Sequence, residues 1–461
     1  MQIGRKDVVW NYAATFLKIA SSALLLPFIL RMMPSEMIGI WSVFMMITAF
    51  SGLLDFGFNP SFIRNVTYVF SGVSTLKVKG FESASKENQT IDYGLLKGVI
   101  TAMRWFYLRM AIILFFLLAT LGTYYIYSLL QNYKGEHKEV YIAWALLCII
   151  NTYNLFTLYY DSLLQGKGLI KRSKQIVIVG QTVYLVIATI LIMAGYGIVA
   201  IVSAQASSVI IIRWLSYHYF FTREIKQRLY NVIPRPQKEI LKAIYPNALK
   251  IGLTSLGGFM VTRSAIVIGS LYLPLEEIAS YGITMQLIAV IAGLAGIYTS
   301  TYQPKIAQLR VVQDNSAIKD IYLKGQGILL LTFLIGGAGL LFIASWALDF
   351  IGSQTQLMPF KLSFLALILI FEETNLSIAG SILVTKNEVP FFKAALLSGF
   401  FIIIGLFVAF KYLKLGFIAM ILVPLIVDFS YQAWKWPWEV KKDLDIILND
   451  VIITAYKIRG K

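Results

Sequence analysis

The chain has 461 residues, of which 58% are hydrophobic and only 14% are charged, and its mean hydropathy is +0.71. Soluble domains are usually about 45–50% apolar and about 25% charged, so the composition excludes an ordinary soluble domain and predicts a polytopic membrane protein. The single cysteine, Cys148, lies in an apolar run, which excludes a disulfide framework and a cysteine metal site. We therefore predict neither a metal nor another cofactor.

Apolar stretches long enough to cross a bilayer recur along the whole chain, and no low-complexity linker separates them. The basic first residues resemble the start of a signal peptide, but the apolar stretch that follows is too long and carries Lys18, so we interpret it as a first span. We predict twelve spans, near residues 8–30, 37–58, 108–130, 140–160, 175–195, 198–221, 251–273, 278–303, 325–345, 358–384, 394–410 and 415–434.

The formal net charge of +17 is distributed unevenly over the loops that these spans define. Loops on the side of the N-terminus hold the basic excess, whereas the opposite loops contain slightly more acidic than basic residues. This asymmetry over short loops is the positive-inside pattern, and it predicts that both termini are cytoplasmic. The basic charge is thereby explained as a topology signal, and no nucleic-acid partner is predicted.

A short motif occurs twice, 240 residues apart: residues 34–41 read PSEMIGIW and residues 274–281 read PLEEIASY. Each copy links the first two spans of a six-span half, and two halves with an even number of crossings run parallel in the membrane. We predict an N-lobe over residues 1–221, a basic linker over 222–250, a C-lobe over 251–434 and an amphipathic tail over 435–461.

Each predicted lobe opens with a span that carries a central cation. Arg263 is the only charge in residues 251–275, and Lys18 has a similar position in the first span. An arginine near the bilayer centre costs at least about 2.5–3.5 kcal/mol, so it is expected to face a water-filled cavity, a carboxylate or an anionic ligand. The alternative is a long side chain that reaches the interface, which we favour for Arg213 because it lies nearer a span end.

Acidic residues in the spans are few. Glu372 and Glu373 lie at the centre of the tenth span, where one of them is expected to face a cavity and take up a proton or Na⁺, or to pair with Arg263. A structural ion pair is the alternative. Asp55 ends the second span with Arg64 nine residues later, which is consistent with a gate or with an exposed pair at a helix end. Asp428 in the twelfth span is a weaker candidate of the same kind.

Several loose motifs together resemble those of bacterial polysaccharide flippases in the multidrug/oligosaccharidyl-lipid/polysaccharide exporter superfamily. They are LLPFILR at 25–31, ExxGxWS at 36–42, LDFG at 54–57, GGF at 257–259, ASYG at 279–282 and QxWKWP at 432–437. The resemblance implies an all-α membrane protein with two six-helix lobes in a V around a cationic cavity. Many family members carry an acidic residue in this part of the seventh span, where this chain reads Thr262-Arg263-Ser264.

The resemblance also implies a function in the bacterial inner membrane: export of undecaprenyl-diphosphate-linked oligosaccharide to the outer leaflet for surface polysaccharide such as O-antigen. Lys18, Arg263 and Arg64 are then the candidate diphosphate ligands, and Glu372, Glu373 and Asp55 the candidate coupling or gating residues. The implied partners are the lipid-linked oligosaccharide, membrane lipids, a proton or Na⁺ counter-ion and polysaccharide polymerase machinery.

Two alternatives to a flippase stay open at this point. A cation-coupled multidrug antiporter would have the same fold, but its cationic cargo would be repelled by Lys18 and Arg263 unless their charges are paired. A membrane-embedded glycosyl polymerase or ligase would be an enzyme with a large periplasmic loop, whereas the longest polar loop here, residues 59–107, is predicted to be cytoplasmic. We therefore expect a transporter and not an enzyme.

Overall fold

The computed structural model describes residues 5–73, 75, 91–131, 133–311, 314–386, 390–447 and 450. Within these ranges every regular element is a helix, which confirms the predicted all-helical fold class. Some helical residues are described by their backbone alone, and Lys18 is one of them, so its predicted role as a diphosphate ligand falls on a side chain outside the described residues.

Eleven helical segments in the described part of the chain are long and apolar enough to cross a membrane: Ser35–Leu53, Tyr93–Leu130, His137–Gly166, Ile170–Met193, Gly197–Phe220, Gly252–Gly269, Leu275–Gln303, Asn315–Phe342, Phe360–Leu383, Phe392–Lys411 and Gly416–Asp443. They overlap the second to twelfth predicted spans, and the first prediction, residues 8–30, lies within helix α1 (Arg5–Met32). The protein is therefore a multi-pass membrane protein by length and composition of its helices.

The described residues of the predicted polar loop 59–107 are largely helical, which corrects the sequence-based boundary. It contains α3 (Phe58–Phe70) and the beginning of α4 (Tyr93–Leu117), which continues through a π-helical turn, η1 (Leu118–Gly122), into α5 (Thr123–Leu130). The sequence-based prediction assigned the beginning of α4 to a loop because the segment contains the charged residues Lys97 and Arg104. A helix can carry such residues in its first turns, where their side chains reach the interface.

The chain divides into two compact units, and the boundary cuts three continuous helices. Unit 1 comprises Met1–Phe28 and Phe44–Leu256, and unit 2 comprises Ile29–Val43 and Gly257–Lys461. Helices α1, α2 (Ser35–Leu53) and α11 (Gln237–Gly269) each begin in one unit and end in the other. The predicted lobe and linker boundaries remain a prediction.

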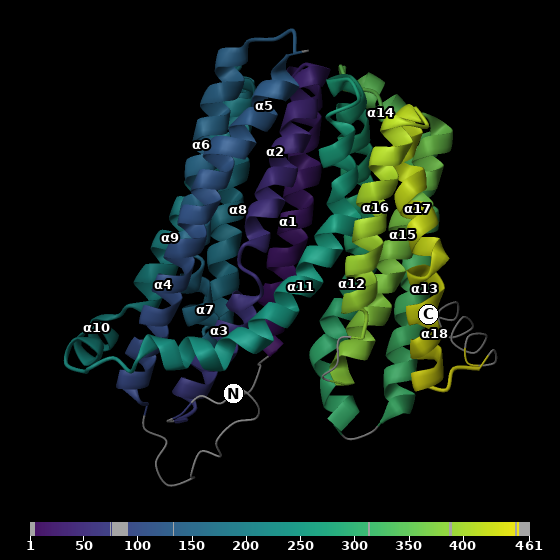
Figure 1. Cartoon of the computed structure of the whole chain (residues 1–461). Coiled ribbons are helices and arrows are strands. Elements are labelled where there is room, and N and C mark those ends of the chain that lie inside the picture. The colour runs from purple at the N-terminus through teal and green to yellow at the C-terminus, as the bar shows by residue number, and fades with distance from the viewer. Residues whose placement is uncertain are drawn as a thin grey trace. The chain divides into compact units, whose positions relative to one another are not determined.

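Unit 1 is a helical bundle (Figure 1). Helix α9 packs against α8, α6 and α7, while α4 contacts α3 and α6. Glycines allow the closest approaches, because a Cβ on Gly180 of α8 would overlap the side chain of Ile212 on α9. The remaining helices of this bundle are α6 (His137–Phe156), α7 (Tyr159–Gly166), α8 (Ile170–Met193), α9 (Gly197–Phe220) and α10 (Arg223–Tyr230).

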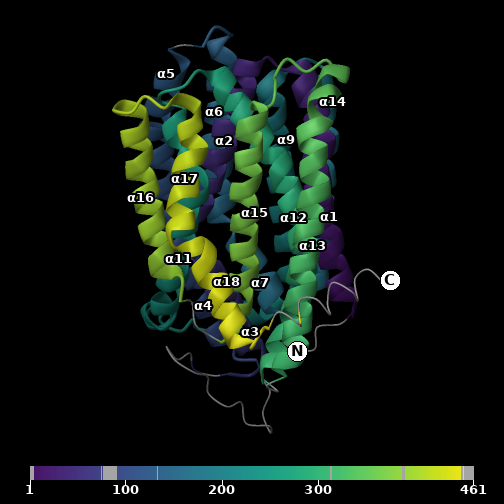
Figure 2. The same cartoon turned by 90° about the vertical axis from the view of Figure 1, so that its right-hand side faces the viewer.

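Unit 2 is a second bundle, in which α15 contacts α12, α13, α17 and α18. Figure 2 shows α13, α15, α17 and α16 as neighbouring long helices, with α18 continuing below α17. The elements of this bundle beyond α11 are α12 (Leu275–Val311), α13 (Asn315–Phe342), α14 (Ala344–Phe350), α15 (Phe360–Leu383), η2 (Val384–Lys386), α16 (Phe392–Lys411), η3 (Gly416–Ile418), α17 (Ala419–Ser430) and α18 (Gln432–Asp443).

The two copies of the repeated motif contact each other within unit 2. A Cβ on Gly282 of α12 would overlap the hydroxyl of Ser42 on α2, and one on Gly39 would overlap the carbonyl oxygen of Leu275. Ser42 and Gly282 each come one residue after the motif, so equivalent positions of the two copies are in contact. Small residues are therefore required here by close helix packing.

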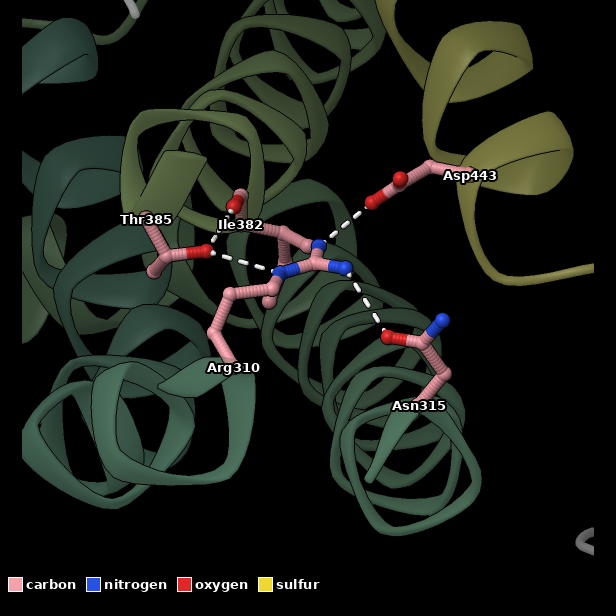
Figure 3. Close-up of polar contacts among 5 residues, drawn as sticks. All are labelled: Arg310, Asn315, Ile382, Thr385 and Asp443. Atoms are coloured by element: carbon pink, nitrogen blue, oxygen red, sulfur yellow. Dashed lines mark hydrogen bonds and ion pairs between the residues drawn. The ribbon is translucent and has the colours of Figure 1, made fainter. Parts of the chain in front are cut away.

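Hydrogen bonds and an ion pair of Arg310 connect four elements of unit 2 (Figure 3). From the end of α12 its guanidinium donates to Thr385 Oγ1 in η2 at 3.3 Å and to Asn315 Oδ1 on α13 at 3.1 Å, and it forms an ion pair with Asp443 at the end of α18. The side chains of Arg310 and Asp443 are only 13% and 10% exposed. The last turn of α18 is thereby fixed to the ends of its neighbours.

Candidate functional site

Arg263 lies on α11, within the segment Gly252–Gly269 that is apolar enough to span a membrane. The helix ends at Gly269, so the six residues that follow Arg263 in it span about 9 Å, and Arg263 lies nearer this end than the sequence predicted. Its side chain is exposed, and among the described residues it makes no hydrogen bond or ion pair. Arg263 thus presents an unpaired positive charge on a membrane helix.

Three carboxylates come together in the same unit, and we call them the carboxylate cluster: Glu372 and Glu373 of α15 and Asp428 of α17. Glu372 is 5% exposed and Asp428 is 1% exposed, and the four oxygens of these two side chains have no hydrogen-bond partner. The three groups interact electrostatically with one another, and Arg263 is the cation that acts on Glu373. The sequence predicted the two glutamates as a site and ranked Asp428 lower.

The neighbourhood of the carboxylate cluster supplies little neutralising charge. Gln432 at the start of α18 is buried and interacts with Asp428, while the buried Tyr281 of α12 interacts electrostatically with Glu373 and Arg263. Arg263 and Glu373 are not within ion-pair distance, so the predicted pairing is a longer-range interaction. Unpaired carboxylates are costly in an apolar bundle, which makes this cluster a place where a proton or a cation would be stabilised.

Asp55 has a structural role at the junction of α2 and α3. The backbone turns sharply there, with φ of 45° at Phe56 and 70° at Gly57. Both carboxylate oxygens accept from the backbone N–H of Asn59, at 2.9 and 3.1 Å, and one also accepts from Tyr107 Oη of α4 at 2.6 Å. These bonds satisfy the start of α3, as a helix cap does.

The structure does not bring Asp55 and Arg64 together. Arg64 lies on α3, its side chain is exposed, and it makes no hydrogen bond or ion pair with any described residue. The exposed Asp55–Arg64 pair that the sequence allowed is therefore absent from this part of the chain. The charge of Arg64 is available to bind an anion, so its role as a diphosphate ligand stays a prediction.

Arg213 on α9 is a buried cation whose surroundings the sequence did not predict. Its residue is 6% exposed, one guanidinium nitrogen donates to Asn154 Oδ1 on α6 at 2.6 Å, and Nε has no partner. Asp161 interacts with Arg213 electrostatically without an ion pair, and its two carboxylate oxygens accept from Gln165 and Ser173 at 2.8 Å each.

Three tyrosines, Tyr107, Tyr153 and Tyr160, interact electrostatically with this buried cation. Because Arg213 is buried and bonded to Asn154, its side chain points into the bundle. The snorkelling prediction for Arg213 is therefore wrong. The predicted span 198–221 gave a usable signal, because eight of its residues follow Arg213, about 12 Å of helix, which is long for a side chain that must reach water.

Comparison with known proteins finds solved structures of similar fold. No family model matches the sequence, and no curated protein matches it. An inward-facing MATE multidrug transporter of the MOP superfamily matches with a TM-score of 0.60 and 14% identity, over 95% of this chain and 98% of that chain. The lipid II flippase MurJ in an inward closed conformation matches with a TM-score of 0.62 and 14% identity, over 98% and 90%.

A MOP-superfamily transporter from Pyrococcus furiosus, whose binding pocket is described as having reversed polarity, matches with a TM-score of 0.56 and 16% identity, over 96% of both chains. These three proteins are named as transporters or a flippase. The matches cover almost the whole chain, and at these identities they show the fold. The chain therefore has the fold of MOP-superfamily transporters, as the sequence predicted.

Proposed function

We propose that this protein is a flippase that moves undecaprenyl-diphosphate-linked oligosaccharide from the cytoplasmic to the outer leaflet of a bacterial inner membrane, for surface polysaccharide synthesis. The observation that carries the proposal is Arg263, an exposed guanidinium without a protein partner on a membrane helix. Such a cation is costly in a membrane unless water or an anion neutralises it. A diphosphate headgroup is an anion of the right chemistry, because guanidinium groups bind phosphate oxygens with charge-assisted hydrogen bonds.

The physics of the cargo supports a dedicated polar route. A sugar headgroup cannot cross hydrocarbon alone, because each hydroxyl without a hydrogen-bond partner costs several kcal/mol. Outward movement of a doubly negative headgroup is favoured by an inside-negative potential of about 100 mV, which contributes roughly 4–5 kcal/mol. In this mechanism Arg263 binds the diphosphate while the prenyl chain stays in lipid.

Export can also be coupled to a cation at the carboxylate cluster. Glu372 and Asp428 have four buried oxygens without partners, so a proton or Na⁺ bound there would relieve the cost of their burial. Loss of that cation would leave Glu373 free to interact more strongly with Arg263. We propose that competition between cation and substrate couples export to cation movement: the cation binds the carboxylate cluster, and the substrate binds Arg263, whose charge also acts on Glu373.

Reconstitution tests the transport step directly. Purified protein in vesicles that contain lipid-linked oligosaccharide is expected to expose the glycan to an added membrane-impermeant glycan-modifying enzyme, on a time scale faster than in empty vesicles. Unchanged glycan accessibility in protein-containing vesicles would reject the flippase proposal.

A cation-coupled multidrug antiporter is the second candidate, and the carboxylate cluster is the observation that favours it. A buried acidic group can bind a counter-ion in exchange for a cationic drug, and one structural relative is named as a multidrug transporter. The same vesicles, loaded with a dye cation, separate the two functions. Dye movement without glycan movement would assign the antiporter function, and formation of glycosidic bonds would assign an enzyme.

A further inference from the structure

The connection between α9 and α11 exposes apolar side chains outside the predicted spans. We call residues 222–238 the elbow; it contains α10. Ile233 is 89% exposed and Tyr230 is 85% exposed, which makes them the most exposed large apolar side chains among the residues that the structure describes. The neighbouring Ile225 is buried, so α10 has one side chain that anchors it to the bundle while the elbow directs others outward.

Hydrogen bonds hold the elbow against the first turns of α4. Lys97 Nζ donates to the carbonyl oxygen of Val232 at 2.7 Å, and the backbone N–H of Arg235 donates to the carbonyl oxygen of Gly94 at 3.2 Å. Arg235 also pairs with Asp92 at 2.6 Å. Asp92 in turn accepts from the backbone N–H of Leu95 and caps α4, so these contacts fix the elbow to the first turns of the span.

This attachment places the elbow beside the beginning of α4, the helix that continues into the candidate span Tyr93–Leu130. Figure 1 shows α10 extending sideways from the bundle of unit 1, next to the lower end of α4. Contact between α10 and α4 agrees with that view. Exposed tyrosine and isoleucine at this level would be accommodated by the boundary between headgroups and acyl chains.

Basic side chains share the same surface. Arg223, Lys226 and Arg228 of α10 are all exposed. Lys226 lies over the ring of Tyr217 with 5.1 Å to its centroid, and Arg228 lies over Tyr93 at 5.3 Å. Glu224 is the one acid on α10, and Arg228 already pairs with it at 3.3 Å, which leaves Arg223 and Lys226 as net positive charge.

We propose that the elbow is a binding site for anionic phospholipid headgroups. Arg223 and Lys226 bind headgroup phosphates, while Tyr230 and Ile233 insert at the acyl boundary. Combined basic and apolar contacts of this kind distinguish an anionic bilayer surface from a soluble anion, because only the bilayer offers both. The occupant is the lipid of the surrounding leaflet, so the proposal does not depend on which cargo the protein transports.

Lipid retention measures the charge contribution. In native mass spectrometry of the full-length protein with phosphatidylglycerol, Arg223→Gln/Lys226→Gln is expected to bind the lipid at least tenfold more weakly, since each basic residue near an anionic surface contributes about fivefold. Lys134→Gln/Lys138→Gln removes the same charge from exposed positions elsewhere and is the matched control. Equal loss in the two variants would overturn a specific site at the elbow.

Insertion is measured separately, with an environment-sensitive fluorophore on Ile233→Cys in a Cys148→Ala background. In nanodiscs the emission is expected to shift to shorter wavelength, and further when phosphatidylglycerol replaces part of the phosphatidylcholine. A fluorophore on Glu136→Cys, in a loop with balanced charge, is expected to respond to neither change. Water-like emission at position 233 in both lipids would overturn the proposal. So would displacement of phosphatidylglycerol by inorganic diphosphate at equal concentration, because it would indicate a phosphate site instead of a lipid surface.

Discussion

Arg263 and Arg213 are both arginines in membrane helices, yet their surroundings give them different expected roles. Arg263 is exposed and has no hydrogen bond or ion pair with described residues, so its charge is free to meet a ligand. Arg213 is buried and already donates to Asn154. We therefore propose substrate binding for Arg263, and expect Arg213 to hold α9 and α6 together.

The first prediction concerns Arg263. Arg263→Ala is expected to lower flipping of lipid-linked oligosaccharide by about tenfold to a hundredfold, because a hydrogen bond to a charged group contributes about 1.5–3 kcal/mol. Arg263→Lys keeps the charge but loses the planar fork, and it should retain part of the rate. Initial rates in vesicles measure both.

Arg109→Ala is the control for this comparison. Arg109 is another exposed arginine on a membrane helix, but its guanidinium already stacks on Trp105, 3.8 Å from the ring centroid. Arg109→Ala should change the initial rate of flipping by less than about twofold relative to the unsubstituted protein. Native flipping by Arg263→Ala, in protein that reaches the membrane in normal amount, would remove this residue from the mechanism.

The second prediction concerns the carboxylate cluster. Glu372→Gln preserves shape and abolishes ionisation, so transport should lose its dependence on an imposed proton or Na⁺ gradient while the unfolding free energy changes by less than about 1 kcal/mol. The exposed Glu136→Gln serves as the matched substitution and should keep the gradient dependence. An unaltered response of Glu372→Gln to both gradients would exclude coupling through Glu372.

At the scale of elements, the ends of helices in unit 2 are joined by a partly buried ion pair. Arg310 and Asp443 belong to α12 and α18, and each side chain is largely shielded from water. Shielding strengthens their interaction relative to an exposed pair and also makes the loss of one partner costly.

The third prediction is a double-mutant cycle on this pair. Arg310→Gln and Asp443→Asn should each lower the unfolding free energy by about 1–3 kcal/mol in detergent, with a coupling energy of at least about 1 kcal/mol between them. The same cycle on Glu224 and Arg228, whose side chains are 71% and 56% exposed, should give less than about 0.5 kcal/mol. Additive effects of Arg310→Gln and Asp443→Asn would show that the pair does not stabilise the bundle.

For the whole molecule, the contact between the two repeated motifs is the feature most closely linked to alternating access. Helix α2 opens the second span of the first half and α12 has the same place in the second half, and they pack at Ser42 and Gly282. Transporters with parallel repeats work by movement of one repeat against the other. We expect this contact to loosen during transport.

The fourth prediction follows from that expectation. Ser42→Cys/Gly282→Cys in a Cys148→Ala background should form a disulfide on mild oxidation after a small separation of α2 and α12, because a Cβ at position 282 would lie 2.8 Å from the Ser42 Cβ, closer than the about 3.8 Å of a disulfide. Flipping should stop on oxidation and return on reduction. Either single cysteine variant should be insensitive to the oxidant, and full flipping by the crosslinked protein would mean that this contact persists throughout the cycle.

The length of an apolar stretch is a local property, and for that reason the sequence alone predicted the all-helical membrane fold and eleven spans that overlap the observed apolar helices. It also identified Arg263 and the glutamates, since an isolated charge in an apolar run is visible without coordinates. The sequence-based prediction placed the start of α4 in a loop, because charged residues lie in the first turns of this helix. The sequence does not show where a helix leaves the membrane.

Only the tertiary structure determined which charged side chains interact with one another. It brought Asp428 next to Glu372 across helices that are far apart in the sequence, separated Asp55 from Arg64, and turned Arg213 inward. It likewise fixed the elbow beside α4 through Lys97 and Arg235. The physical reason is that a side chain's partner depends on helix rotation and packing, which follow from the whole bundle and not from the spacing of residues along one helix.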